Sequence, residues 1–169
     1  MRPIRFRPLA ALCAAALSLS GTASAQVVIS QVYGGGGNSG APLRNDFIEL
    51  YNAGPTAVSL ATYSVQYASS TGTSWQRTNL TGTLQPGQYY LVQQAAGTNT
   101  AAAALPTPDA IGTIAMSGTA GKVALVANQT ALTGACPGTP DGVLDFVGFG
   151  GANCSETAPT AALSNTTAA

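Results

Sequence analysis

The sequence predicts an all-β fold, a sandwich or a barrel, from two observations. Short runs in which apolar and polar residues alternate recur along the chain, and Gly, Pro and Asn residues separate them. Side chains alternate between the two faces of a strand, so each run is typical of a strand with one buried face. In addition, no long segment combines the 3.6-residue apolar period with the end signals of a helix.

The stretch 27–54 organises the chain. A first strand is predicted over 27–33, with Val28 and Val32 on one face. A glycine-rich loop over 34–42 leads to a second strand over 46–52. The pattern leaves two alternatives open for the buried face of this second strand: either Ile48 and Leu50, or Phe47 and Tyr51.

Further strands follow at short spacing. The segment 84–87 is a turn signal, because Pro86 presets φ and Gly87 accepts a positive φ, as a type II turn requires. Trp75, the single tryptophan, is interpreted as core packing. The remaining strands are expected at 58–60, 63–67, 75–80, 88–93, 122–126 and 144–149.

The first 25 residues have the pattern of an export signal. Three arginines precede an apolar run over 9–19, and a small-residue cleavage motif ends at Ala25, directly before Gln26. The apolar run is too short for a stable membrane span, although an anchor that stays attached is the alternative. The pattern predicts a bacterial protein that is secreted, periplasmic or held at the cell surface.

The remainder is long enough for one domain, which we expect over residues 26–150. Residues 151–169 lose the strand pattern and are expected to form an irregular tail. Three basic and six acidic residues follow residue 25, which gives this part a net charge of −3. Nucleic acid is therefore an unfavourable partner for this chain alone.

Two cysteines follow the predicted cleavage position, Cys136 and Cys154. In an exported protein a pair of cysteines predicts a disulfide, which would contribute about 3 kcal/mol to stability. The alternative is two unpaired thiols in a mobile tail.

Histidine is absent from the whole sequence. This excludes Ser-His-Asp and Cys-His catalysis and histidine-bound zinc, and we predict no catalytic residue, no cofactor and no resident metal. A calcium site built from Asp46, Asp141 or Asp145 is kept as an alternative. Asp46 and Glu49 are three apart on a strand, so they are expected on opposite faces, and Glu49 is expected to pair with Arg44 or Arg77.

Two glycine motifs partly match phosphate-binding patterns, but neither has the context that phosphate binding requires. The pattern over 35–40 fits a dinucleotide fingerprint, but Pro42 and a strand follow it where a helix is required, so a flexible connection is predicted. The pattern over 118–122 has the wrong spacing for a phosphate loop, and Val123 replaces the required Ser or Thr. Lys122 is instead expected as the exposed start of a strand.

Several segments in a specific order resemble the lamin-tail domain family, over about residues 27–150. The segments that carry the resemblance are 28–32, 45–54, 58–60, 63–65, 84–92, 116–118, 122–125 and 145–150. The resemblance implies an immunoglobulin-like β-sandwich that acts as an interaction or targeting module without catalytic residues. Bacterial exported members that resemble this chain look like the N-terminal modules of longer proteins, some of them secreted nucleases. Relative to these longer members, the tail over residues 151–169 is expected to be cut short.

Three hypotheses of function follow. The first is a non-catalytic exported module that binds a surface, a polymer or a partner domain; Tyr63 and Tyr67 would offer a stacking surface unless they belong to the core. The second is the N-terminal part of a secreted endonuclease/exonuclease/phosphatase-type nuclease whose catalytic domain is absent from this chain. The third is self-association through an exposed sheet edge.

Overall fold

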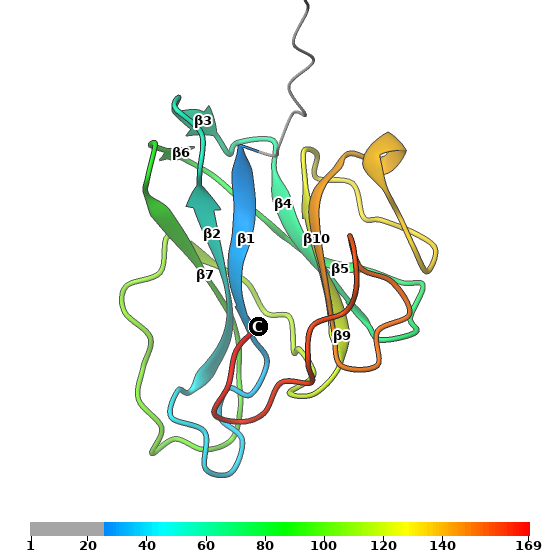
Figure 1. Cartoon of the computed structure of the whole chain (residues 1–169). Coiled ribbons are helices and arrows are strands. Elements are labelled where there is room, and N and C mark those ends of the chain that lie inside the picture. Colours follow the sequence, from blue (N-terminus) through cyan, green and yellow to red (C-terminus); the bar gives the residue numbers. More distant parts are fainter. Residues whose placement is uncertain (1–25) are drawn as a thin grey trace, which may run out of the picture.

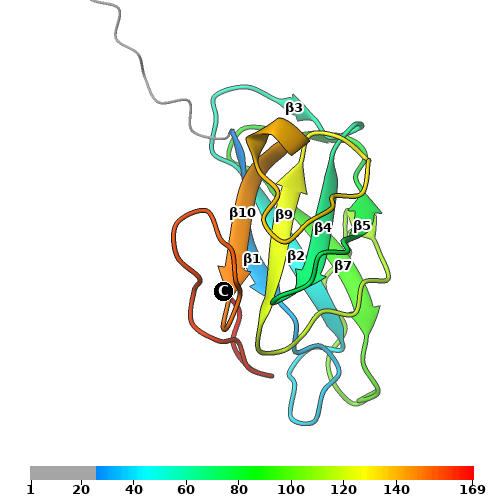
Figure 2. The same ribbon diagram turned by 90° about the vertical axis from the view of Figure 1, so that its right-hand side faces the viewer.

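The computed structural model describes residues 26–169 as two facing four-stranded sheets (Figures 1 and 2), which confirms the predicted β-sandwich. The predicted leader, residues 1–25, lies outside the described residues. The first sheet has the order β1 (Val27–Tyr33), β2 (Asn45–Asn52), β7 (Tyr89–Ala96) and β8 (Ala110–Ile111). The second sheet has the order β10 (Val143–Phe149), β9 (Gly121–Val126), β4 (Ser64–Ser69) and β5 (Gln76–Asn79).

Shorter elements complete the fold. β3 (Val58–Ser59) and β6 (Thr83–Leu84) pair as a two-stranded ribbon, and η1 (Thr139–Asp141) is a single 3-10 turn. Every strand pair is antiparallel except β7 with β8. Gly87 has a φ of 72°, as the predicted turn before β7 requires.

The core lies between the two sheets. Ile48 and Leu50 on β2 are fully buried there, which decides between the two alternatives for this strand. They belong to one cluster with Val65 of β4 and with Val123 and Leu125 of β9. Inward residues thus come from alternate positions of both sheets, the pattern of an aligned sandwich.

A β-bulge in β1 changes which residues face the core. The register with β2 shifts between Ile29 and Gln31, so that Ile29 lies opposite Leu50 and Val32 lies opposite Ile48. Ile29 and Val32 therefore both face the core. The prediction that Val28 shares a face with Val32 is wrong, because strict alternation does not hold across the bulge.

The chain after β10 packs back onto the sandwich. Ala169 and Val32 exchange two main-chain hydrogen bonds of 2.9 and 3.0 Å, and Figure 1 shows the end of the chain beside β1. Leu163 is buried in the main core. Asp145 of β10 accepts a hydrogen bond from the N–H of Ile29 (2.6 Å), which links the edges of the two sheets on the same side. The segment 150–169 contains no extended strand, yet it is part of the packed structure.

Leu163 should contribute to stability as a core residue does. We expect Leu163→Ala to lower the free energy of unfolding by about 2 kcal/mol or more, because it removes buried methyl groups and leaves a cavity. Urea denaturation measures this. Leu144→Ala is the matched control, because Leu144 is 36% exposed and should change the free energy much less. Equal effects of the two substitutions would contradict the packing of the tail.

Candidate binding surface

The outer face of the first sheet carries a row of large side chains. Because Ile48 and Leu50 point inward, the alternation along β2 places Glu49 and Tyr51 outward. Tyr51 lies opposite Val28 of β1 on one side and opposite Tyr89 of β7 on the other. The rings of Tyr51 and Tyr89 lie 4.8 Å apart between centroids at an angle of 37°, and Tyr89 is 60% exposed.

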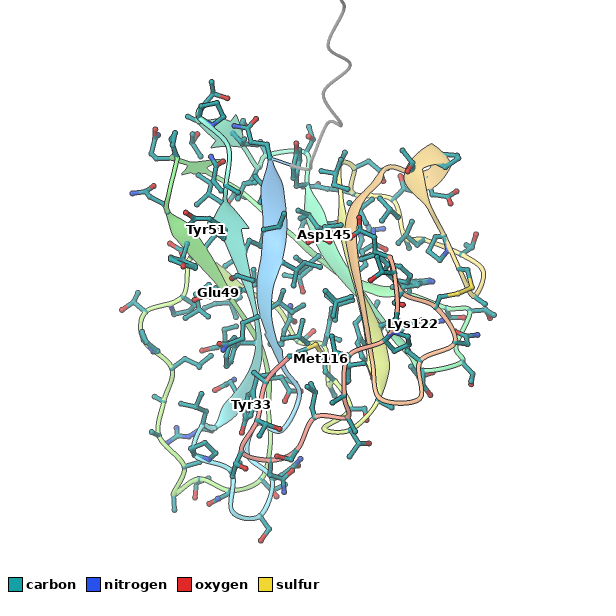
Figure 3. All side chains as sticks on the ribbon, viewed as in Figure 1. Tyr33, Glu49, Tyr51, Met116, Lys122 and Asp145 are labelled. Carbon is teal, nitrogen blue, oxygen red and sulfur yellow. A yellow bond between two sulfur atoms is a disulfide. The ribbon has the colours of Figure 1, made fainter. Side chains whose placement is uncertain are left out.

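The neighbouring row on this face contains the polar side chains of Glu49 and Ser30 together with Leu91. Glu49 lies opposite Leu91, and its Oε1 accepts a hydrogen bond of 2.8 Å from the hydroxyl of Ser30. The prediction that Glu49 pairs with Arg44 or Arg77 is wrong. Figure 3 shows Tyr51 and Glu49 one below the other along β2, on the side of the first sheet away from Lys122.

Other segments cover the lower part of the same face. Tyr33 and Phe47 are buried there and their rings stack with centroids 5.4 Å apart. The hydroxyl of Tyr33 donates a hydrogen bond of 2.6 Å to the carbonyl of Asn165 in the tail. Burial raises the pKa of Tyr33, and the nearby charge of Asp46 adds to this rise. The open surface is therefore limited to the part of the sheet around Tyr51 and Tyr89.

The outer face of the second sheet, by contrast, is covered. Loop residues pack over it and form a second small core with Trp75, Phe146 and Leu132. The rings of Trp75 and Phe146 lie 5.8 Å apart, so the tryptophan is a packing residue, as the sequence predicts. An antiparallel sheet commonly keeps one face in water, and here that face belongs to the first sheet.

Lys122 lies under this covering layer and is fully buried. Its Nζ donates hydrogen bonds to the carbonyls of Gly72 (2.8 Å) and Ala135 (2.7 Å) and to Oδ1 of Asn153 (2.9 Å). It also lies 5.5 Å from the centre of the Trp75 ring. Burial lowers the pKa of this ammonium group. The prediction of an exposed Lys122 is wrong, because three loops distant in sequence supply its acceptors.

The predicted cysteine pair joins two of the same loops. Cys136 and Cys154 form a disulfide with their Cα atoms 5.6 Å apart. Cys136 directly follows Ala135, and Cys154 directly follows Asn153. Both of these preceding residues accept a hydrogen bond from Lys122. The disulfide and the buried ammonium thus hold one and the same pair of segments.

Asp46 connects loops at the lower end of the sandwich. One carboxylate oxygen accepts the N–H of Gly36 and the other accepts the N–H of Met116, both at 2.8 Å. Gly36 must be glycine, since a Cβ there would lie 2.1 Å from the carbonyl carbon of Asn45. Burial raises the pKa of Asp46 to about 6, against the lowering effect of its two hydrogen bonds. The glycine-rich loop is therefore bound to the sheet by a carboxylate.

The calcium alternative receives no support from the geometry. Both oxygens of Asp46 accept main-chain N–H groups, while Asp141 accepts the N–H of Gly138 and Asp145 accepts that of Ile29. Over residues 26–169, no three His, Cys, Asp or Glu side chains lie close enough together to hold a metal ion.

A cavity of about 340 Å³ lies beside the disulfide. Asp145, Phe146 and Glu156 line it together with the segment from Cys136 to Thr139. Burial raises the pKa of Glu156, and a hydrogen bond with Asp145 and the charge of Asp145 add to this rise.

The stacking surface expected from Tyr63 and Tyr67 is absent. Tyr67 is buried, and its hydroxyl accepts a hydrogen bond of 3.0 Å from the N–H of Ser117. Tyr63 is partly buried and packs against the core. This is the core alternative stated above, and the exposed tyrosine is Tyr89 instead, which lies beside the half-buried Tyr51.

The sequence matches the family described as Lamin Tail Domain over residues 20–163. The chain belongs to the lamin tail domain family. No curated protein matches the chain. Among the residues that the structure describes, no helix has the length and apolar character needed to cross a membrane. The family match and the observed sheets support an immunoglobulin-like module without catalytic function.

Sequence reasoning missed the Tyr51–Tyr89 pair of this lamin tail domain. Both residues alternate with buried partners, Leu50 and Tyr90, so their outward orientation could be read from the strand pattern once the buried face was known. Their proximity depends on the pairing of β2 with β7, which a single sequence does not reveal.

Asp46 should make the stability of the lamin tail domain depend on pH. Its folded pKa of about 6 lies above the ordinary 3.8, so between these values the folded state binds more protons than the unfolded state. The free energy of unfolding then falls as pH rises through this window, by about 3 kcal/mol at most. We expect Asp46→Asn to lose this dependence.

The measurement is urea denaturation of both proteins at pH 4 and pH 7. The free energy of unfolding of wild type minus that of Asp46→Asn should be smaller at pH 7 than at pH 4. Taking this difference removes the effects of the other titrating groups. A difference that stays constant would show that the carboxyl pKa is not raised.

Lys122 should be irreplaceable by an apolar residue of similar length. Lys122→Met leaves three part-buried acceptors without their donor and removes a buried ammonium group from its partners, and we expect the free energy of unfolding to fall by about 3 kcal/mol. Thermal and urea denaturation measure this, with Arg77→Met on the exposed surface as the control. A loss of unfolding free energy no larger than that of the control would contradict a stabilising role for the hydrogen bonds of Lys122.

Proposed function

We propose that this lamin tail domain is an exported, non-catalytic binding module that contacts its target through the outer face of β1, β2 and β7. The observation that carries the proposal is the ring pair of the exposed Tyr89 and the half-buried Tyr51 on the outer face of the first sheet. The leader pattern over residues 1–25 and the disulfide support export to an oxidising compartment.

Tyrosine pairs on rigid strands are favourable contact residues. A tyrosine offers a large surface with only two side-chain torsions to immobilise, and the cross-strand contact already restrains both rings. Aromatic residues of this kind account for much of the binding free energy in known interfaces. Val28 and Leu91 are half-buried beside the pair and extend the apolar area.

The nuclease hypothesis assigns catalysis to residues outside this chain and stays a prediction. It is compatible with the same binding face, because a targeting module and a catalytic domain can occupy one polypeptide. Its test is an activity assay on any longer form of the protein.

Removal of both rings should abolish binding without unfolding the domain. The exported form of the chain is sedimented with insoluble probes of different chemistry: cell-wall polymer, lipid vesicles and immobilised DNA. We expect retention by at least one probe and a loss of at least tenfold in Tyr51→Ala/Tyr89→Ala, because each aromatic contact contributes about 1–3 kcal/mol.

Leu144→Ala on the second sheet is the matched control and should bind as wild type does. Circular dichroism verifies that the double variant is folded. Retention by none of the probes, or equal retention of the double variant, would refute the proposed binding face.

A further inference from the structure

We infer that the ligand of the Tyr51–Tyr89 face is an uncharged polysaccharide that lies across β1, β2 and β7. This inference rests on the proposed function, because it names the class of molecule that the same face takes. Three properties of the face lead to it: its charge, its aromatic geometry and its hydrogen-bonding row.

The charge of the face disfavours anionic ligands. It carries the carboxylate of Glu49, and the three basic residues among those described lie elsewhere. Arg44 donates to the carbonyl of Thr100 in a loop, Arg77 is on β5 of the opposite sheet, and Lys122 is buried. Nucleic acid, anionic lipid or an acidic glycan would therefore meet a carboxylate and no cation.

The aromatic pair forms a platform suited to sugar rings. One face of a pyranose presents C–H groups, which pack against the negative face of an aromatic ring. Tyr51 and Tyr89 sit opposite each other on adjacent strands with their rings in contact, so a sugar unit can pack against the side of the exposed Tyr89 ring that Tyr51 leaves free. The contact between the rings keeps this platform in place before binding, which lowers the entropic cost.

The neighbouring row supplies hydrogen-bond partners for hydroxyl groups. Ser30 donates to Oε1 of Glu49, and this bond orients the carboxylate beside the platform. The remaining oxygen, Oε2, can accept a hydroxyl proton, and the Ser30 oxygen can accept another.

This alternation of an aromatic row with a polar row favours a glycan over a protein partner. The central area of a protein interface is mostly apolar and depleted of charged residues. Here the carboxylate of Glu49 is directly adjacent to the tyrosine row, as a polymer with both C–H faces and hydroxyl edges requires.

The test is affinity electrophoresis of the exported chain in native gels that contain soluble polysaccharides. The uncharged probes are hydroxyethyl cellulose, glycol chitin, galactomannan and dextran, and carboxymethyl cellulose is the anionic counterpart of the first. We expect retardation by at least one uncharged polymer, and at least tenfold weaker binding to carboxymethyl cellulose than to hydroxyethyl cellulose if the latter is the polymer bound.

Variants separate stacking from charge. Tyr51→Phe/Tyr89→Phe keeps both rings and should bind within about threefold of wild type, while Tyr51→Ala/Tyr89→Ala should lose at least tenfold. Glu49→Gln should reduce the difference in affinity between uncharged and anionic polymers, because it removes the carboxylate that repels the anionic ones. Bovine serum albumin run in the same gels controls for nonspecific retardation.

The failures of the two proposals are distinguishable. Retention of the chain by vesicles, DNA or a protein through the two tyrosines, with no retardation by any uncharged polysaccharide, would overturn the glycan inference and leave the binding face intact. Retardation that the double alanine variant preserves would overturn both.

Discussion

The inward face of β2 is the constraint on which the rest of the structure depends. Ile48 and Leu50 occupy the middle of this face and fill the core, while Asp46 and Asn52 lie at its two ends and bind loops. A shift of the register by one residue would expose both apolar side chains and bury Glu49 and Tyr51. The strand therefore has one possible orientation, and the outer face with Tyr51 follows from it.

Contacts cover the β1 edge of the sandwich and the outer face of the second sheet, while the outer face of the first sheet stays uncovered around Tyr51. Asp145 and the end of the chain bind the edge of β1, while Lys122 and the Cys136–Cys154 disulfide hold the loops over the second sheet. These contacts hold segments that form no β-strand hydrogen bonds with a neighbouring strand over most of their length. The outer face of the first sheet needs no such cover around Tyr51, and it stays available on a rigid support.

The strands could be predicted because the two-residue period of buried positions is local in sequence. The bulge at Ile29 could not, since one extra residue in a strand leaves no signal in composition. Lys122 and Leu163 are buried by segments that are distant from them in sequence. The residues around Lys122 therefore suggested an exposed position, and those around Leu163 gave no indication of burial. The tyrosine pair required the β2–β7 register, which is likewise non-local.

We propose that this rigid, non-catalytic lamin tail domain binds through the outer face of its first sheet. The measurement that tests this is amide chemical-shift mapping by NMR, with an uncharged β-linked glucose hexasaccharide titrated into residues 26–169. We expect the shifted amides to cluster around Val28, Tyr51 and Tyr89. A cluster around Phe146 and Glu156, at the cavity beside the disulfide, would place the binding site on the other sheet and refute the proposed binding face.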